Sequence, residues 1–287
     1  MTMTLWQAIL LGIVQGLTEF IPISSTAHLT LAGKLMGIVN PERPEEWTAF
    51  IAVIQLGTLI AVILYFLKDI FEITRGWLKT NLSYVTKAEI SEDDRHWSML
   101  GWMVIVGSIP VGVVGLLFRH QIEGKLTKNL WIIGTSEVGL ALILTLAEII
   151  GRRRRDMKQL TILDSIVVGV AQCFALIPGS SRSGTTIAGG LFSGLNREAA
   201  ARFSFLLSIP AVAASGLLEL KEALHSISAS PVDLAISTLF SLIFGYLSIA
   251  WLLKYLQRHS TYLFVGYRVG LGVVILALLA YGKVSAY

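Results

Sequence analysis

Long runs of apolar residues, separated by short polar stretches, make up most of this chain. Six of the runs are long enough to cross a bilayer as helices of about 20 residues, and they cover 48–67, 100–118, 129–150, 203–224, 233–257 and 262–281. Two further apolar regions, 5–38 and 162–194, contain proline, glycine and serine near their middles, and these residues interrupt helices. We expect each of these two regions to form a re-entrant pair of short helices, which enters the membrane and returns to the same side.

The two interruptions have related sequences. Ile21-Pro-Ile-Ser-Ser25 recurs later as Ile177-Pro-Gly-Ser-Ser181, which indicates an internal duplication within a single membrane domain, with halves of about 1–150 and 160–287. Each half holds one re-entrant pair and three spans, and because three is odd the second half must be inserted upside down. The predicted fold is therefore an all-α polytopic membrane protein with six transmembrane helices, two re-entrant helix pairs and an inverted-topology repeat. Such repeats bind ligands at their interface near the membrane midplane.

Composition and charge support a membrane protein. Hydrophobic residues make up 54% of the chain and charged residues 15%, whereas a soluble domain has about 25% charged residues. The basic cluster Arg152–Arg155 places the loop 151–160 on the cytoplasmic side. The other loops follow the same bias except 119–128, which is basic although the span count places it outside. We interpret the net charge of +4 as a consequence of this topology, so no nucleic-acid partner is expected.

Polar residues around the first interruption suggest metal or proton chemistry. Gln15 and Glu19 are four residues apart and share one helix face, and a carboxylate at membrane depth marks a functional site by default. Glu19 is a candidate ligand of a divalent cation or a candidate base, with Gln15 as a neutral oxygen ligand. The alternative is a helix-end glutamate that reaches the surface. His28 is close enough in sequence to Ser25 to assist it, unless it is only a structural hydrogen-bonding residue.

The second interruption has the composition of a phosphate site. Small residues such as Gly179 let the backbone approach an anion, and exposed N–H groups at a helix start point toward it. Arg182 supplies a planar set of donors that matches phosphate oxygens. The hydroxyl groups of Ser181, Ser183 and Thr186 complete the predicted site. The alternative is a packing cluster in which Arg182 pairs with a buried carboxylate.

Other polar residues within the spans are interpreted as structural. Glu137 and Glu148 are expected to reach the membrane interface, and Gln55 and Gln172 are expected to form hydrogen bonds between helices.

The segments Gln15–His28 and Pro178–Thr186, followed by Phe203–Pro210, resemble those of the undecaprenyl-diphosphate phosphatase family linked to bacitracin resistance. The similarity extends over essentially the whole chain. It implies an enzyme of the bacterial inner membrane that converts undecaprenyl diphosphate to undecaprenyl phosphate and inorganic phosphate. This reaction recycles the carrier lipid for peptidoglycan synthesis and confers resistance to bacitracin. The resemblance also implies a divalent cation, Mg or Ca, and a homodimer.

The resemblance assigns roles to residues of both motifs. Glu19, Ser25, His28 and Arg182 fall on positions implied to be catalytic, and Glu19 and Gln15 on the metal site. Substrate binding is expected of Ser24, Gly179, Ser181, Ser183 and Thr186. The family has Glu or Gln at the first position of the metal motif, and the Gln15 variant leaves one carboxylate, which puts a two-carboxylate metal site in doubt.

The expected mechanism is attack by Ser25 on the terminal phosphorus, assisted by His28 or Glu19, followed by hydrolysis. Direct attack by His28 or by a metal-bound water is the alternative. An inverted repeat with a central anion site also fits a lipid-phosphate flippase or a small-anion transporter. A phosphatidic-acid-type phosphatase is disfavoured, because its Arg-Pro, Ser-Gly-His and late Arg, His and Asp motifs are missing from this sequence.

Overall fold

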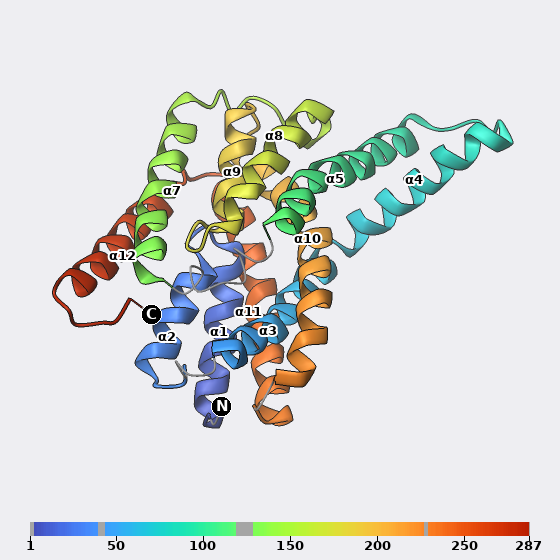
Figure 1. Ribbon diagram of the computed structural model, residues 1–287. Helices are drawn as coiled ribbons and strands as arrows, with labels where there is room; N and C mark the ends of the chain where they lie inside the picture. Colours follow the sequence, from blue (N-terminus) through green and yellow to red (C-terminus); the bar gives the residue numbers. More distant parts are fainter. Residues whose placement is uncertain (1–2, 40–43, 119–128, 227–228, 287) are drawn as a thin grey trace.

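The computed structural model describes residues 3–39, 44–118, 129–226 and 229–286. The regular structure of these residues is almost entirely helical (Figure 1). The α-helices are α1 (Leu5–Phe20), α2 (Ser25–Leu35), α3 (Pro44–Tyr65), α4 (Leu67–Thr86), α5 (Glu92–Leu117), α7 (Leu130–Ile150), α8 (Ile162–Cys173), α9 (Arg182–Phe192), α10 (Arg197–Ser226), α11 (Pro231–Leu256) and α12 (Tyr262–Ala280). Two single-turn 3-10 helices, η2 (Met157–Gln159) and η3 (Phe174–Leu176), lie before and after α8.

Six of the described helices are long and apolar enough to cross a membrane, which confirms the predicted number of spans. They are Glu46–Tyr65, Glu92–Leu117, Leu130–Ile150, Arg197–Gly216, Pro231–Leu256 and Tyr262–Ala280. Helix α5 begins well before the apolar run that predicted it. Ser91 caps this helix by accepting a hydrogen bond from the Asp94 N–H at 3.1 Å. Acidic residues occupy the first turn, where their negative charge interacts favourably with the helix dipole.

Helix α4 lies between the predicted spans 48–67 and 100–118, where no helix was predicted. It lies antiparallel to α5, and the two extend together away from the other helices (Figure 1). The contact is close at Gly76, where an added Cβ atom would lie 2.8 Å from the Asp94 carbonyl oxygen. Charged and polar residues are interspersed among the apolar residues of α4. The average hydropathy of this helix is therefore too low to indicate a membrane span.

The crossing of α1 and α11 determines where the end of α1 lies. Added Cβ atoms at Gly12 and Gly16 would lie 2.4 Å and 2.7 Å from the carbonyl oxygens of Ser237 and Ser241. Small residues four positions apart allow two helix backbones to approach closely in a membrane. The Ser248 hydroxyl also donates to the Gly16 carbonyl at 3.0 Å. The last turn of α1 is therefore held rigidly against α11.

Both apolar regions with a predicted interruption form a helix, a break and a second helix. The first break covers 21–24 and the second covers 177–181. Each break ends in a serine N-cap with a positive φ, 69° at Ser24 and 60° at Ser181. Each serine Oγ accepts a hydrogen bond from the N–H group three residues later, at 3.3 Å. Both helix starts are thus built in the same way.

The structural match between the breaks differs by one residue from the sequence match. The sequence pairs Ser25 with Ser181, but the N-caps pair Ser24 with Ser181 and therefore Ser25 with Arg182. The second break contains one residue more than the first, and Gly179 has a φ of +87° there. An added Cβ at Gly179 would lie 2.6 Å from the Ile133 carbonyl oxygen, so both conformation and space require glycine.

Candidate functional site

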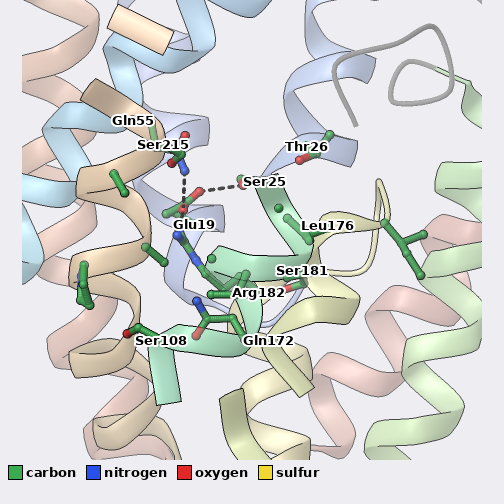
Figure 2. A pocket seen from close by; sticks show the side chains of 18 of the residues that line it. Glu19, Ser25, Thr26, Gln55, Ser108, Gln172, Leu176, Ser181, Arg182 and Ser215 are labelled. Atoms are coloured by element: carbon green, nitrogen blue, oxygen red, sulfur yellow. Dashed lines mark hydrogen bonds and ion pairs between the residues drawn. The ribbon is translucent and has the colours of Figure 1, made fainter. Parts of the chain in front are cut away.

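The buried carboxylate of Glu19 connects four helices through hydrogen bonds. Its Oε1 accepts from the guanidinium of Arg182 and, at 3.2 Å, from the Gln55 amide. Its Oε2 accepts from the Ser25 hydroxyl at 2.8 Å and from the Gln15 amide at 3.1 Å. These residues come from α1, α2, α3 and α9, and Figure 2 shows Gln55, Ser25 and Arg182 converging on Glu19. The alternative, in which Glu19 is a helix-end glutamate that reaches the surface, does not hold, because the carboxylate is buried among these partners.

The positions of Ser25 and Arg182 follow from the two helix breaks. Each is the first residue of the helix that follows its break, α2 for Ser25 and α9 for Arg182. The side chains leave from two capped helix starts and meet at Glu19, which is in the last turn of α1. The alternative interpretation of the sequence, in which Arg182 pairs with a buried carboxylate, is correct for this arrangement.

A cavity of about 590 Å³ opens beside this cluster. Its polar end is lined by Glu19, Ser24, Ser25, Thr26, Gln55, Gly179, Ser181 and Arg182. Its apolar wall comes mainly from η3, α5 and α10, and includes Val111, Leu116, Leu176, Ile177, Ala211 and Ala214. A cavity of this kind accommodates a ligand with an anionic head and an apolar chain.

Arg268 connects the two helix breaks through hydrogen bonds to the backbone of each. This residue of α12 is fully buried and donates hydrogen bonds to the carbonyl oxygens of Pro22 at 3.3 Å and Gly179 at 2.9 Å. It also forms an ion pair with Glu137, at 3.1 Å from Oε2. Backbone carbonyls freed by a break at membrane depth need such a donor. The signal in the sequence was a charged residue within the span 262–281, which marks a functional or structural site.

Some of the predicted binding residues line the cavity, and others are buried in the protein outside the cavity lining. Ser24, Gly179 and Ser181 line the cavity. The Ser183 hydroxyl shares a 3.2 Å hydrogen bond with the Ser181 hydroxyl, and Ser183 is buried outside the lining. Thr186 is fully buried and bonds the Arg182 carbonyl oxygen at 2.7 Å, and its hydroxyl also contacts Ser204 of α10. Thr186 therefore anchors the start of α9.

His28 does not line the cavity. Its Nδ1 lies 2.7 Å from the Ser24 carbonyl oxygen, and its Nε2 lies 2.6 Å from the Tyr267 hydroxyl. The imidazole also stacks on the Tyr267 ring, with 5.5 Å between ring centroids. Both nitrogen atoms are engaged away from Ser25, so the structure does not bring these two predicted catalytic residues together.

The predictions for the other buried polar residues had mixed outcomes. Gln55 does connect two helices, as expected, through its bond to Glu19. Glu137 and Glu148 were expected to reach the membrane interface, and the structure shows both to be almost fully buried within the protein. Glu148 accepts hydrogen bonds from Arg153, Arg197 and Thr261, and these partners offset the cost of burying its charge.

Gln172 differs from the other buried amides. Neither its Oε1 nor its Nε2 has a hydrogen-bond partner in the part of the chain that the structure describes, although the residue is only 1% exposed. A buried polar group left unpaired costs about 1–3 kcal/mol. The expectation of a hydrogen bond between helices is therefore wrong for the described residues. Gln172 lines the cavity together with Arg182.

Two oxygen-bearing side chains fit a hard divalent cation. The Gln15 Oε1 is buried without a partner among the described residues, and its amide nitrogen already bonds Glu19. Carboxylate and amide oxygens are suitable ligands of Mg²⁺ and Ca²⁺. Within the described ranges, no group of three or more His, Cys, Asp or Glu side chains is placed to hold a metal ion. A cation at Glu19 and Gln15 would need further oxygen ligands from water or a phosphorylated ligand.

Comparison with known proteins identifies the family. The family model described as bacitracin resistance protein BacA matches residues 8–274. A protein named undecaprenyl-diphosphatase from Syntrophobacter fumaroxidans is 54% identical, with 96% of this chain and 97% of the relative covered. Proteins of the same name from Mycobacterium ulcerans and Chlorobaculum tepidum are 47% and 48% identical, and the alignments cover at least 98% of this chain and 99% of each relative. The chain belongs to the BacA family.

The buried ion pair between Arg268 and Glu137 should stabilise the two breaks as a unit. We expect Arg268→Met to lower the free energy of unfolding by about 3–5 kcal/mol, because it leaves the Glu137 charge buried and unpaired. Adding Glu137→Gln should restore much of the lost stability, which chemical unfolding of the purified proteins in detergent would measure. A double variant with the summed losses of both single variants would show that the two residues are not coupled.

Proposed function

We infer from the family membership that the protein is an undecaprenyl-diphosphatase, a hydrolase of the bacterial membrane. It converts undecaprenyl diphosphate to undecaprenyl phosphate and inorganic phosphate, and thereby recycles the carrier lipid and confers resistance to bacitracin. The similarity to proteins of that name over nearly the full length carries this inference. The cavity supports it, because a charged end and an apolar wall match the two parts of such a lipid.

Substrate binding requires Arg182 to change partner. The guanidinium is turned toward Glu19 in the ligand-free protein, whereas a residue that clamps phosphate must point to phosphate oxygens. We propose that the diphosphate draws Arg182 away from Glu19, because a diphosphate carries more negative charge than one carboxylate and its oxygens match the planar guanidinium in a bidentate contact. The hydroxyls of Ser24 and Ser181 and the backbone at Gly179 complete the phosphate site. The prenyl chain lies along the apolar wall.

The same exchange makes Glu19 available to a divalent cation. Glu19 and the unpartnered Gln15 Oε1 would hold Mg²⁺ or Ca²⁺, and phosphate oxygens and water would supply the remaining ligands. When bound, the cation would neutralise charge on the diphosphate. The retained carboxylate and the neutral glutamine together suffice for a cation that the substrate helps to hold.

The contacts of Ser25 support a role for Glu19 as its base. The Ser25 hydroxyl already donates to Glu19 Oε2 at 2.8 Å. We propose that Glu19 takes this proton while Ser25 Oγ forms a bond to the terminal phosphorus. The bond from that phosphorus to the bridging oxygen breaks, and undecaprenyl phosphate leaves with its electron pair. Water then adds to the phosphoserine, Glu19 returns the proton to Ser25 Oγ, and inorganic phosphate is released.

Arg182 also stabilises the charge that develops on the transferred phosphoryl group. The capped helix start fixes the backbone of Arg182, and once its guanidinium is on the phosphate little further reorganisation is needed during the reaction. His28 acts at a distance in this scheme: it supports the Ser24 carbonyl and the packing of α2 on α12 through Tyr267.

We also propose the finer membrane topology expected from the sequence. The matching helix, break and N-cap geometry of α1–α2 and α8–α9 supports two re-entrant pairs related by an inverted repeat. Labelling single cysteines introduced at Thr4 and Val39 from one side of the membrane tests the first pair. Labelling from opposite sides would contradict re-entry. A homodimer remains the expectation that accompanies family membership.

Phosphate release by the purified protein in detergent tests the function directly. Wild type should release phosphate from undecaprenyl diphosphate with Mg²⁺ or Ca²⁺, and EDTA should stop the release. Arg182→Ala should lower kcat/KM about 10- to 100-fold or more, because a charged phosphate contact is lost. Thr145→Ala, whose hydroxyl donates to the Ala141 carbonyl oxygen of its own helix and is not part of the cavity lining, should remain active. Translocation of lipid phosphate in vesicles without any phosphate release would favour a flippase instead.

Variants of Glu19 and His28 test which of the two residues is the general base. Glu19→Gln keeps the shape of the side chain and should lower kcat by about 10²- to 10⁴-fold, the usual contribution of a general base. His28→Gln should lower it by less than about tenfold, because a group outside the cavity contributes only through structure. Covalently bound phosphate should be detectable on wild type and lost in Ser25→Ala. A loss in His28→Gln as large as in Glu19→Gln would contradict the assignment.

A further inference from the structure

Gln172 presents an unsatisfied amide at the wall of the substrate cavity. It is the next-to-last residue of α8 and is 1% exposed, and both polar atoms lack partners within the described residues. Figure 2 shows it beside Arg182, on the side of the guanidinium away from Glu19 and Ser25. The following residues Ala175 and Leu176 belong to the apolar part of the lining. The amide therefore lies between the polar end of the cavity and the apolar wall.

Close packing fixes the backbone that carries this amide. Gly169, one turn before Gln172, lies against α5, and an added Cβ there would be 2.2 Å from the Gly107 carbonyl oxygen. On the other side, Ala171 Cβ lies against Gly189 of α9. Helix α8 is thus held between α5 and α9, which fixes the backbone of Gln172 at the cavity wall. Any hydrogen-bond partner of the Gln172 amide must therefore come to it at this position.

A buried amide without a partner destabilises the protein in which it lies. A leucine or methionine would fill the same space without this cost, so the polar group implies a partner that is present at another stage. The adjacent Arg182 is the residue that must leave Glu19 when the diphosphate binds. Once Arg182 has turned to phosphate, the Gln172 amide lies beside the same anion.

We propose that Gln172 is a substrate-binding residue, whose Nε2 donates a hydrogen bond to the phosphate attached to the prenyl chain. This inference rests on the proposed diphosphatase function. The chain-linked phosphate is assigned because Ser25, which receives the terminal phosphoryl group, lies on the far side of Arg182, whereas the apolar wall continues from Gln172. The neutral amide binds a phosphate oxygen without adding positive charge. It therefore distinguishes the two phosphates by where their oxygens lie and not by their charge.

The assignment predicts a particular kinetic pattern. The chain-linked phosphate is present in the substrate, in the transition state and in the lipid product, so Gln172 contributes to all three equally. An interaction that does not strengthen in the transition state changes KM and leaves kcat almost unchanged. The same interaction should appear in inhibition by undecaprenyl phosphate.

The test uses Gln172→Leu and Gln172→Met in the purified full-length protein. Both variants should raise KM for undecaprenyl diphosphate about 10- to 100-fold, with kcat within about twofold of wild type. The inhibition constant of undecaprenyl phosphate should rise by the same factor. The Tm of the substrate-free variants should equal or exceed that of wild type, because an unpaired buried amide has been removed.

Thr238→Val is the matched control. The Thr238 hydroxyl on α11 is also buried without a partner in the described chain, but Thr238 is not part of the cavity lining. Its replacement should leave KM, kcat and product inhibition unchanged and should not lower the Tm. The control separates removal of an unpaired polar atom from removal of a substrate contact.

Two results would overturn the inference. An unchanged KM and inhibition constant in both Gln172 variants would show that the amide meets only water. A fall in Tm together with kcat and KM defects would show a structural role. Either result leaves the diphosphatase assignment intact as long as wild type releases phosphate, whereas a wild type that releases none would refute the proposed function itself.

Discussion

The Glu19 carboxylate and the Arg182 guanidinium form the contact on which the site depends, because they join helix breaks that are far apart in the sequence. A break at membrane depth leaves backbone groups without partners, and such groups are costly in hydrocarbon. Arg268 satisfies carbonyl oxygens of both breaks, and Ser24 and Ser181 cap the helices that follow. With these needs met, Glu19 and Arg182 can be held close to each other in a buried position.

The same contact stabilises the ligand-free protein and must open for the proposed reaction. A buried ion pair offers little net stability once desolvation is included, which makes an exchange of partners with phosphate and a cation feasible. Ser25 remains bonded to Glu19 from another helix, so the proposed nucleophile stays in place while Arg182 moves. The unpaired Gln172 amide fits this picture, since a group that is unsatisfied at rest favours the state in which the ligand is bound.

Much of the fold could be predicted because membrane spans impose a strong pattern on the sequence. Six apolar runs and two interruptions indicated the helices correctly, and the rarity of charge at membrane depth indicated Glu19. Helix α4 was missed because it alternates charged and apolar residues. The one-residue offset that pairs Ser25 with Arg182 depends on the backbone at Gly179, which sequence similarity does not reveal. His28 turns to Tyr267 because tertiary packing, and not spacing from Ser25, decides its direction. Arg268 was detectable by the rule that was applied to Glu19.

A structure of the protein with Mg²⁺ and a non-hydrolysable methylene analogue of undecaprenyl diphosphate would test the central claim most directly. The exchange of partners predicts that the Arg182 guanidinium contacts phosphate oxygens and has left Glu19, while the Glu19 carboxylate contacts the cation and Ser25. An analogue bound in the cavity with Arg182 still paired to Glu19 would contradict the account.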